Sequence, residues 1–588
     1  MDFRALGEFS RYLESIGELK RITIQVDPEL EITEIATSAL KRGLPALLFE
    51  NVKGSSFPLA INLFASERRI ELALGKHPDQ LGEELITFAE QAMPPAAGFV
   101  HSNRGIVRRL FASRPKEIDA ALSQEHVGEP RLDRLPIIRC WPEDGGKFIT
   151  LPQVFTYDPR NGRRNVGMYR MQVFDRRTTG MHWQIQKGGG FHYYHADKLN
   201  RSVEIAVALG TDPALLMATI AALPEGIDEA MFAGFLRKKR TEFVRGRSIS
   251  VPVPANAEFI LEGIVHAKER RLEGPFGDHF GHYSAASEFP VFHVTAMTHR
   301  TNPIFPATVV GIPPMEDKFL GDATQRILGP LAKLLHSEIR GLWAYYEAGF
   351  HNLLVVAIEE RYQKEAMKTA LGLMGTGQLS LTKCIVMVSE DVNPRNFSEV
   401  LSALHRNFDP HFDFVMIPKV PLDTLDFTSY KMNLGSKMIL DATRKSGKEP
   451  REVKRGRLDV ARIKELDRRI LDAAIVGDGF VLVKVKDEGK LVLQELAPRP
   501  EFQDVTILAA VSEDIDLKNQ ESYLWGVFTR FDCERDVIFA EQSLYGISPV
   551  YKGVLGIDAT WKQGYPETLV MNEDIRELVR RRWDKYWN

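Results

Sequence analysis

Two carboxylates lie close together in the segment EGPFGDHFGHY, which runs from Glu273 to Tyr283. Gly-Pro-Phe-Gly separates Glu273 from Asp278, and because such a sequence must turn tightly, it could bring both acids toward one site. A neighbouring like charge would raise the pKa of one acid, whereas a guanidinium such as that of Arg170 would keep the other ionised. One proton donor beside one fixed anion is the arrangement that acid–base catalysis needs. A surface turn with two solvated acids is the alternative.

A second stretch, residues 165–190, supplies further polar groups. Asn165 and Arg170 precede two strand-like runs, MQVF and MHWQIQ, which a charged turn separates. Two short strands joined by a polar turn predict a β-hairpin. The three glycines that follow, Gly188 to Gly190, would let backbone approach a ligand closely. An ordinary hairpin with solvated charges is the alternative here.

The oxygen donors of this region favour a hard metal ion. Asn165 and Glu242, which opens an alternating strand after a helical patch at 228–237, offer the oxygens that Mg²⁺ or Mn²⁺ prefers over zinc. Histidines in the same region could form a zinc site, although no HExxH motif or cysteine pair supports one: His182, His192, His195, His279 and His282. Neither of the two common phosphate-binding motifs occurs.

The composition excludes several classes of protein. The chain has 588 residues, enough for about three or four domains. It carries 76 basic against 79 acidic residues, so no basic excess exists to neutralise the phosphates of a nucleic acid. Three widely separated cysteines indicate neither a disulfide framework nor a zinc knuckle: Cys140, Cys384 and Cys533. Since neither a signal peptide nor an apolar run of roughly 20 residues occurs, we expect a cytoplasmic protein.

The elements that must position these groups change in character along the chain. The first region alternates helices with strands, one of them at 46–49. From about 137 to 315, short strands punctuated by Gly and Pro predict a barrel or sandwich rather than a Rossmann sheet. A helix near 323–339 leads to a further αβ region, which opens with a buried strand at 353–360.

This last region contains an internal repeat. A segment that begins with Ser-Glu-Asp at Ser389 and ends in Asp-Ala-Thr at Asp441 recurs from Ser512 to Asp558. The offsets are 512 − 389 = 123 and 558 − 441 = 117, so the second copy is shorter by six residues. Each copy reads as strand, acidic turn, amphipathic helix and strand, a unit that would pack in a stacked or pseudo-symmetric way. Between the copies we predict a hairpin that turns at 487–489.

Four segments in this order and spacing resemble the UbiD family of prenylated-flavin-dependent decarboxylases: NVGMYR, TTGMHWQ, KRTEFV and EGPFGDHFGHY. The resemblance covers roughly residues 1–445. In that family a central split barrel holds prenylated FMN, Mn²⁺ bridges its phosphate to the protein, and a monovalent cation lies close by. An Arg–Glu–Glu/Asp trio surrounds the reacting carbon. Loss of CO₂ from an sp² carbon needs such a cofactor, because no side chain can delocalise the carbanion.

The resemblance implies a role for each matching residue. Arg170, Glu273 and Asp278 would be the catalytic trio, with Asp278 delivering the proton. The metal ligands would be oxygen donors: Asn165, Glu242 and Gln186. Many members place a histidine where this chain has Gln186, so His192 could reach in instead. The residues lining the flavin would be Met168, Tyr169, Arg170, His182, Trp183, Gln184, Lys187 and Gly188.

The predicted fold is α+β with five parts. They are an N-terminal αβ domain at 1–120, a split-barrel domain that binds prenylated FMN at 121–318, a linker helix at 319–345, a C-terminal αβ domain for oligomerisation at 346–445, and an extension with the second repeat copy at 446–588. We therefore expect a homo-oligomer. A flavin prenyltransferase would supply its cofactor.

The predicted function is the reversible, non-oxidative decarboxylation of an aromatic or α,β-unsaturated acid, with prenylated FMN and Mn²⁺ as cofactors and K⁺ as a further candidate ion. The resemblance suggests a hydroxybenzoate or a naphthoate of quinone biosynthesis as substrate. One alternative is a carboxylase of an aromatic compound. A second is a non-catalytic assembly subunit, against which the presence of all three trio residues argues. A third is a plain flavin oxidoreductase, which would have no use for the carboxylate pair.

Overall fold

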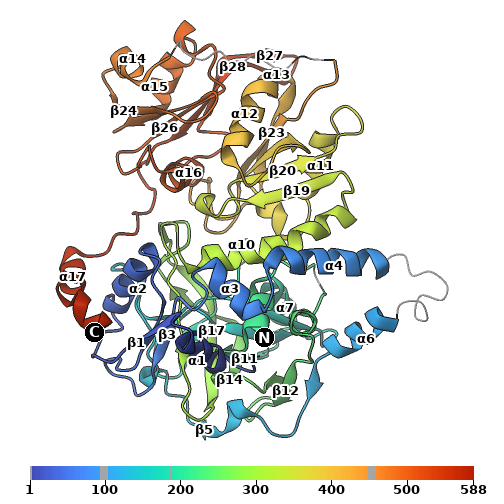
Figure 1. Cartoon of the computed structure of the whole chain (residues 1–588), viewed down its shortest axis with the longest axis vertical. Helices are drawn as coiled ribbons and strands as arrows, with labels where there is room; N and C mark the ends of the chain where they lie inside the picture. The colour runs from blue at the N-terminus through green and yellow to red at the C-terminus, as the bar shows by residue number, and fades with distance from the viewer. Residues whose placement is uncertain (1–2, 93–103, 185–186, 225, 448, 450–457) are drawn as a thin grey trace. The chain divides into compact units, whose positions relative to one another are not determined.

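The structure is a computed structural model that describes residues 3–92, 104–184, 187–224, 226–447, 449 and 458–588. The chain forms two compact units (Figure 1). Unit 1 comprises Met1–Leu328 together with Glu567–Asn588, and unit 2 comprises Gly329–Pro566. The C-terminal segment therefore belongs to the same unit as the N-terminus. Within the described ranges no helix is long and apolar enough to cross a membrane.

A small sheet and four helices form the N-terminal part of unit 1. The strand order is β1-β2-β3-β18, with β1 (Leu19–Ile22), β2 (Ala46–Phe49), β3 (Leu59–Ile61) and β18 (Phe305–Pro306). The helices are α1 (Leu6–Ser15), α2 (Glu31–Lys41), α3 (Glu67–Leu74) and α4 (Pro78–Ala92). The strand predicted at 46–49 is confirmed, and all four of its residues are buried. Apolar positions at helical spacing bury one face of α1, as its sequence pattern requires.

The centre of unit 1 is a seven-stranded sheet in the order β10-β17-β14-β11-β7-β8, with β5 also on β17. Its strands are β5 (His126–Gly128), β7 (Gln153–Tyr157), β8 (Arg164–Met168), β10 (Thr178–Gly180), β11 (Val203–Leu209), β14 (Phe259–Glu273) and β17 (Ser287–His299). The strand pairs within it are antiparallel. Among the described residues no pairing joins β8 to β10, so the expected closure into a split barrel remains a prediction.

Short elements surround the central sheet. The helices of this part within the described ranges are α6 (Arg104–Ser113), α7 (Gly188–Lys198), α8 (Pro213–Ile220), α9 (Glu229–Arg237) and α10 (Glu316–Leu328). A second, three-stranded sheet has the order β13-β12-β4, with β4 (Lys116–Glu117), β12 (Glu242–Arg245) and β13 (Pro252–Pro254). Helix α9 confirms the helical patch predicted at 228–237. The helix predicted near 323–339 lies earlier in the chain. Helix α10 begins at Glu316 and ends at Leu328, and a strand begins at Ile339.

The hairpin predicted within 165–190 is wrong. Strand β8 pairs with β7, β9 (Met171–Gln172) pairs with β6 (Phe148–Ile149), and β10 pairs with β17. The charged turn is closed by an isolated bridge between Val173 and Thr179 and by Phe174 N–H, which donates to the Thr178 carbonyl at 3.0 Å, but residues 181–184 form no second strand of a hairpin. Strands this short gain more hydrogen bonds and burial from other strands of the domain than from each other, which local sequence does not reveal.

Unit 2 contains two five-stranded sheets of the same topology. The first has the order β19-β20-β21-β23-β22, with β19 (Ile339–Ala344), β20 (Leu354–Ile358), β21 (Cys384–Ser389), β22 (Phe414–Val420) and β23 (Gly435–Ala442). The second has the order β24-β25-β26-β28-β27, with β24 (Ile470–Ile475), β25 (Phe480–Val485), β26 (Ile507–Val511), β27 (Val537–Tyr545) and β28 (Ser548–Ala559). The parallel and antiparallel pairs also correspond, as the internal repeat predicts.

Two helices of each copy correspond as well. In the first copy they are α11 (Glu365–Leu373), α12 (Phe397–Asn407) and α13 (Pro410–Asp413), and in the second α14 (Val460–Leu466), α15 (Gly489–Leu496) and α16 (Gln520–Phe528). Helix α15 occupies the position of α11, and α16 that of α12, whereas α13 and α14 do not match each other. The hairpin predicted at 487–489 is therefore wrong. Val492, Leu493 and Leu496 are buried at helical spacing, which favours the helix that starts there.

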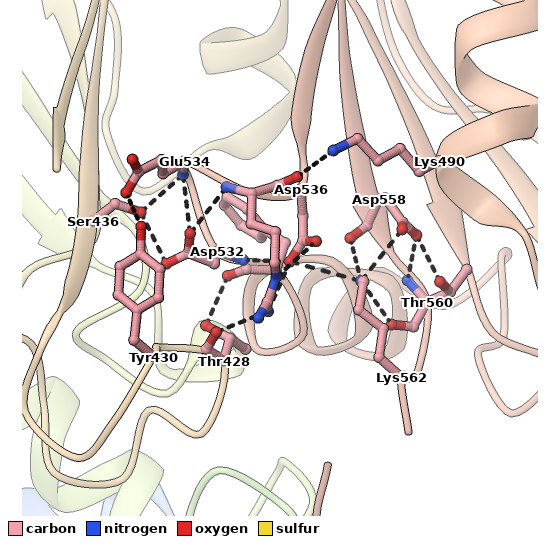
Figure 2. A network of polar contacts seen from close by, with 12 residues as sticks. Thr428, Tyr430, Ser436, Lys490, Asp532, Glu534, Asp536, Asp558, Thr560 and Lys562 are labelled. Atoms are coloured by element: carbon pink, nitrogen blue, oxygen red, sulfur yellow. Dashed lines mark hydrogen bonds and ion pairs between the residues drawn. The ribbon is translucent and has the colours of Figure 1, made fainter. Parts of the chain in front are cut away.

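Polar residues at matching positions make the same contacts in both copies. Thr443 Oγ1 donates to Asp441 Oδ1 at 2.6 Å, and Thr560 Oγ1 donates to Asp558 Oδ1 at the same distance. Figure 2 shows the polar residues of the second copy, among which Lys562 lies beside Asp558 and Asp536. The network also joins the copies, since Ser436 of the first copy donates to Asp532 of the second at 2.9 Å (Figure 2).

Candidate active site

Arg170, Glu273 and Asp278 converge in one buried polar cluster of unit 1. Arg170 follows β8, Glu273 ends β14, and Asp278 follows β15 (Phe276–Gly277). The Arg170 Nε atom lies 3.4 Å from Glu273 Oε1, and Nη1 forms an ion pair with Asp278 Oδ2. The exposed fractions of these three side chains are 9%, 0% and 11%. The turn thus brings both carboxylates to one guanidinium, as the trio requires.

The Arg170 guanidinium is held on its remaining sides. Its Nη2 donates to Ser284 Oγ at 2.8 Å. Ser284 is the last residue of β16 (Tyr283–Ser284). Its Cζ atom lies 4.6 Å from the centre of the Phe276 ring, within the range of a cation–π contact. Two carboxylates, a hydroxyl and an aromatic ring therefore fix the plane of the guanidinium.

Asp278 is an anion in this arrangement. Burial by itself would raise the pKa of Asp278, but the charge of Arg170 and hydrogen bonds from His279 outweigh it and hold that pKa well below its usual value. The His279 backbone N–H and ring Nδ1 lie 2.8 and 2.9 Å from Asp278 Oδ1. A role as proton donor therefore requires an event that weakens these interactions.

His182 contacts the other carboxylate. Its Nδ1 lies 2.8 Å from Glu273 Oε1. Burial and the charge of Arg170 lower the pKa of His182, although Glu273 opposes them, so the ring is neutral. A neutral ring that donates from Nδ1 presents a lone pair at Nε2. That atom and Glu273 Oε2 are buried without a hydrogen-bond partner.

Several residues predicted to hold a cofactor gather where β8 meets the start of α7. An added Cβ at Gly188, the first residue of α7, would collide with the Asn165 side chain, and one at Gly189 would collide with Trp183. The Tyr169 hydroxyl accepts a hydrogen bond from Gly189 N–H at 3.1 Å. Trp183 Nε1 is buried without a partner. The glycines thus allow the first turn of α7, whose N–H groups have no acceptor within the helix, to lie against β8.

The other predicted cofactor residues lie in the same part of the fold. Met168 is the last residue of β8, and Lys187 is the N-cap of α7. An added Cβ at Gly190 would lie 2.8 Å from the Gln184 carbonyl oxygen. Gln186, the third predicted metal ligand, lies outside the described residues. These placements neither test nor contradict the roles predicted for the individual residues.

Glu242 has partners of its own. Its Oε1 lies 2.9 Å from Lys116 Nζ, and its Oε2 accepts from Asn256 Nδ2 at 3.0 Å. The hydrogen bond from Lys116 is the main cause that lowers the pKa of Glu242. His192, the alternative ligand, lies 2.9 Å from Thr156 Oγ1, and Thr156 is the register partner of Asn165 across β7 and β8. His192 is therefore near the strand that carries Asn165.

The histidines considered for zinc do not form a metal cluster. Within the described residues, the one group of three His, Cys, Asp or Glu side chains with metal-binding spacing is His266, Glu269 and His293. It includes none of the five histidines proposed from the sequence. His182 contacts Glu273 and His192 contacts Thr156, which accounts for two of them.

Sequence reasoning missed the residues that hold the segment Glu273–Tyr283, which carries two residues of the predicted trio and is called the catalytic turn below. Gln172 Oε1 accepts from Gly274 N–H at 2.7 Å, and Asp144 accepts from Gly277 N–H at 2.7 Å. Asp144 also accepts from the N–H groups of Cys140 and Trp141, and burial raises its pKa to about 6. No local motif marks these residues, because the turn residues that they hold, Gly274 and Gly277, are distant in the sequence.

A further acid, half-buried, lies beside Asn165. Glu229, in the first turn of α9, accepts from Val166 N–H at 2.9 Å, and burial raises its pKa to about 7. Its position in the first turn of a helix resembles that of an ordinary capping acid, so no sequence signal distinguishes it. A carboxyl group that titrates near neutral pH next to the predicted metal site is a candidate site residue.

Models of one protein family match consecutive parts of this chain. They are the N-terminal, Rift-related and C-terminal domains of 3-octaprenyl-4-hydroxybenzoate carboxy-lyase, matched at residues 11–89, 115–313 and 318–442. The chain belongs to the UbiD family. It is a carboxy-lyase of the UbiD class, and all the site residues predicted above fall within the Rift-related domain.

Individual relatives agree with this assignment. A 4-hydroxybenzoate decarboxylase polypeptide of Chlamydia pneumoniae is 34% identical over 565 residues, which are 96% of this chain and 95% of the relative. The closed form of vanillic acid decarboxylase from Sedimentibacter hydroxybenzoicus superposes with a TM-score of 0.70 at 28% identity, over 77% of this chain and 95% of that one. An evolved dimeric form of the UbiD-class enzyme HmfF from Pelotomaculum thermopropionicum, in complex with prFMN, gives 0.62 at 26% identity, over 78% and 100%.

Proposed function

We propose that this enzyme removes the carboxylate of an aromatic acid as CO₂ with the help of prenylated FMN. The observation that carries the proposal is the buried cluster of Arg170, Glu273 and Asp278 next to polar atoms that have no partner in the protein. Buried polar atoms without partners are rare and indicate a bound molecule or water. The relatives from Chlamydia and Sedimentibacter are named for 4-hydroxybenzoate and vanillic acid, which supports an aromatic substrate.

The residues present fit a flavin cofactor. Unpartnered buried groups at His182 and Trp183 could bind its polar edges, and the first turn of α7 beside Asn165 offers N–H groups to a phosphate. The residues that would hold it are Met168, Tyr169, Arg170, His182, Trp183, Gln184, Lys187 and Gly188. When bound, prenylated FMN supplies the electron sink for the carbanion. The predicted split barrel would enclose it.

The predicted metal ligands would bring Mn²⁺ to the phosphate. They are oxygen donors: Asn165, Glu242 and Gln186. Glu242 is ionised and paired with Lys116, so a divalent cation would have to compete with that lysine. Lysine forms exposed ion pairs of low strength, which makes the exchange feasible. K⁺ is the further ion that the family resemblance suggests.

Arg170 would bind the carboxylate of the substrate. A guanidinium matches a carboxylate with two parallel hydrogen bonds, and Arg170 is already fixed in its plane by Ser284 and Phe276. Such positioning lowers the barrier because the scissile bond is oriented before reaction. The substrate would then share the guanidinium with Asp278.

Binding of the substrate would also prepare Asp278 as an acid. A second anion beside Arg170 weakens the hold on Asp278 and adds a like charge, and both effects raise the pKa of Asp278. Asp278 can then carry a proton. When the bond to CO₂ breaks, the electron pair stays on the ring carbon, and the carbon takes the proton from the Asp278 carboxyl group. Glu273, fixed by His182, would keep Arg170 in place throughout.

We propose a hydroxybenzoate or a naphthoate of quinone biosynthesis as the substrate class. The same groups can act in the opposite direction, since protonation and CO₂ loss are both reversible, and high CO₂ would favour carboxylation. The enzyme would take its cofactor from a flavin prenyltransferase and act as a homo-oligomer.

The test is to produce the full chain together with a flavin prenyltransferase. We expect the released flavin to have the mass of prenylated FMN, elemental analysis to find Mn²⁺, and CO₂ to be released from at least one acid of a hydroxybenzoate and naphthoate panel. Protein made without the prenyltransferase is the control and should release none. Stoichiometric zinc without flavin would contradict the proposal.

A further inference from the structure

The C-terminal segment lies directly against the turn that carries Asp278. The chain leaves unit 2 at Pro566 and rejoins unit 1 at Glu567. Tyr283 N–H donates to the Glu567 carbonyl at 3.3 Å, and Leu569 N–H donates to the Gly281 carbonyl at 3.0 Å. An antiparallel bridge pairs His282 with Thr568 between these two bonds. A short ladder therefore runs along one side of the turn.

Leu569 also packs on the residue that precedes Asp278. Its side chain is buried, with 3% of the residue exposed. An added Cβ at Gly277 would lie 2.8 Å from Leu569 Cδ2 and would collide with Trp141. Gly277 is thus enclosed between Leu569 and Trp141, and its N–H is fixed by Asp144. A shift of Leu569 would leave space for Gly277 and Asp278 to move.

The segment is anchored beyond this contact. Helix α17 (Glu573–Trp587) follows it and lies beside α2 (Figure 1). Tyr586 Oη donates to Glu31 Oε1 at 2.7 Å, and Arg582 Nη1 pairs with the same oxygen at 2.5 Å. The Arg42 Cζ atom lies 4.1 Å from the centre of the Trp583 ring. The segment between Glu567 and Met571 is therefore held between the catalytic turn and a docked helix.

We infer that residues 567–569 are a positioning element for Asp278, which sets the distance between its carboxylate and Arg170. The contacts that hold the other end of the turn come from Gln172 and Asp144. Between Asp278 and Tyr283 the turn's own backbone bonds are local, from Gly281 N–H to the Asp278 carbonyl and from Asp278 N–H to the His282 carbonyl. The C-terminal segment adds the long-range backbone bonds of this half, beside the Arg170–Asp278 ion pair and the bond from Glu143 N–H to Tyr283 Oη at 3.2 Å. The inference rests on the proposed function only in giving Asp278 the proton transfer.

Two variants of the full chain separate the side chain from the backbone. Leu569→Ala removes the packing on Gly277 and keeps the N–H donor, whereas Leu569→Pro removes both. Val570→Ala is the matched control, because Val570 is the next residue and 53% exposed. Leu569→Met tests for rescue by a side chain of similar volume.

We expect amide hydrogen exchange in residues 277–283 to speed up at least about 10-fold in Leu569→Ala and further in Leu569→Pro. In the holoenzyme kcat should fall about 10- to 100-fold, while KM and flavin content stay near wild type, because a small displacement of a catalytic group affects the chemical step. Leu569→Met should restore most of kcat. If Leu569→Pro does not fold, Leu569→Ala against Leu569→Met and Val570→Ala still tests the side-chain contact.

Unchanged exchange in the turn, or faster exchange with unchanged kcat, would overturn the inference. A fall in kcat that also appears in Val570→Ala would do so as well. If wild-type holoenzyme decarboxylates no acid, the proposed function fails. The exchange measurement would still show whether the segment positions the turn.

Discussion

At the scale of single residues, Arg170 is the group on which the others depend. It pairs with Asp278, contacts Glu273 and is oriented by Ser284, and its charge lowers the pKa of Asp278. The ionised Asp278 of this structure and the protonated Asp278 of the proposed reaction would be two states of one site. Occupation of Arg170 by a substrate anion would convert one into the other.

Asp278→Asn tests the proton transfer. The amide keeps nearly the same shape but cannot donate a carboxyl proton, so kcat should fall at least about 100-fold, the lower range for a lost general acid. Flavin content should stay near wild type. Asp175→Asn is the control, because that carboxylate caps an exposed turn through Thr178. Full activity of Asp278→Asn would remove this residue from the mechanism.

His182 gives a prediction about pH. Its pKa is lowered in the folded state, so the folded protein holds less charge on this ring than the unfolded chain does. The contribution of the neutral His182 ring to the free energy of unfolding is fully present above the unfolded pKa of about 6.5. It is lost as pH falls below that value, by at most about 1.4 kcal/mol per pH unit.

Urea unfolding at pH 7 and pH 5 should therefore show a smaller loss of stability in His182→Asn than in wild type. Glu229 and Asp144 also titrate near this range, with pKa values of about 7 and 6, so only the difference between variant and wild type isolates His182. An exposed histidine, in His126→Asn, serves as the control. An identical pH dependence in His182→Asn and wild type would show that His182 titrates alike in both states.

At the scale of elements, the catalytic turn is held mainly from outside its own sequence. Asp144 accepts three backbone N–H groups, from Cys140, Trp141 and Gly277, at 2.7 to 3.0 Å. We expect Asp144→Ala to lower the free energy of unfolding by about 2–4 kcal/mol, because it leaves these buried donors without an acceptor.

Asp144→Asn should cost less, since its carbonyl oxygen can still accept. Glu143→Ala, at the exposed neighbouring position, is the control and should change stability by less than about 0.5 kcal/mol. Urea titration of the three variants checks both expectations. Equal stability of Asp144→Ala and wild type would show that other groups hold the turn.

The sequence allowed the turn itself to be predicted but not its supports. Gly-Pro-Phe-Gly between two acids indicates a tight turn, and helix α9 and strand β2 followed from local periodicity. The pairing of β8, β9 and β10 depends on partners that lie elsewhere in the chain, so the local hairpin pattern led to the wrong answer. Asp144 and Leu569 reach the turn only in the folded chain.

At the scale of the whole molecule, the two repeat copies belong to one unit and contact each other directly. Lys383 Nζ of the first copy donates to the Phe531 carbonyl of the second at 2.9 Å. Thr506, which matches Lys383 at the offset of 123, lies 3.0 Å from His405 of the first copy. The two contacts are not equivalent, because Phe531 matches Phe408 rather than His405 at the same offset. The repeat was visible in the sequence, whereas the return of the C-terminus to unit 1 was not.

Lys383 lies where the two copies meet, and it is also paired with an acid of its own copy. Its side chain is 0% exposed and lies 2.9 Å from Asp426, which is also buried. Lys383→Met should destabilise the protein by about 3–5 kcal/mol, because it leaves a buried carboxylate without its partner.

Lys383→Met combined with Asp426→Asn should recover at least half of that loss, since the unpaired charge is gone. The control is Lys431→Met at an exposed position. Calorimetry of the three proteins measures the effect. A double variant as unstable as the single one would show that the lysine contributes through Phe531 rather than through the ion pair.

The most direct test of the central claim is the fate of the ring carbon in deuterated water. Holoenzyme that carries prenylated FMN should convert an aromatic acid of the panel into a product with one deuterium at the carbon that lost its carboxylate, together with an equal amount of CO₂. Mass spectrometry of the product gives both the position and the amount. Holoenzyme with a full complement of prenylated FMN that forms neither CO₂ nor deuterated product from any acid would contradict the account.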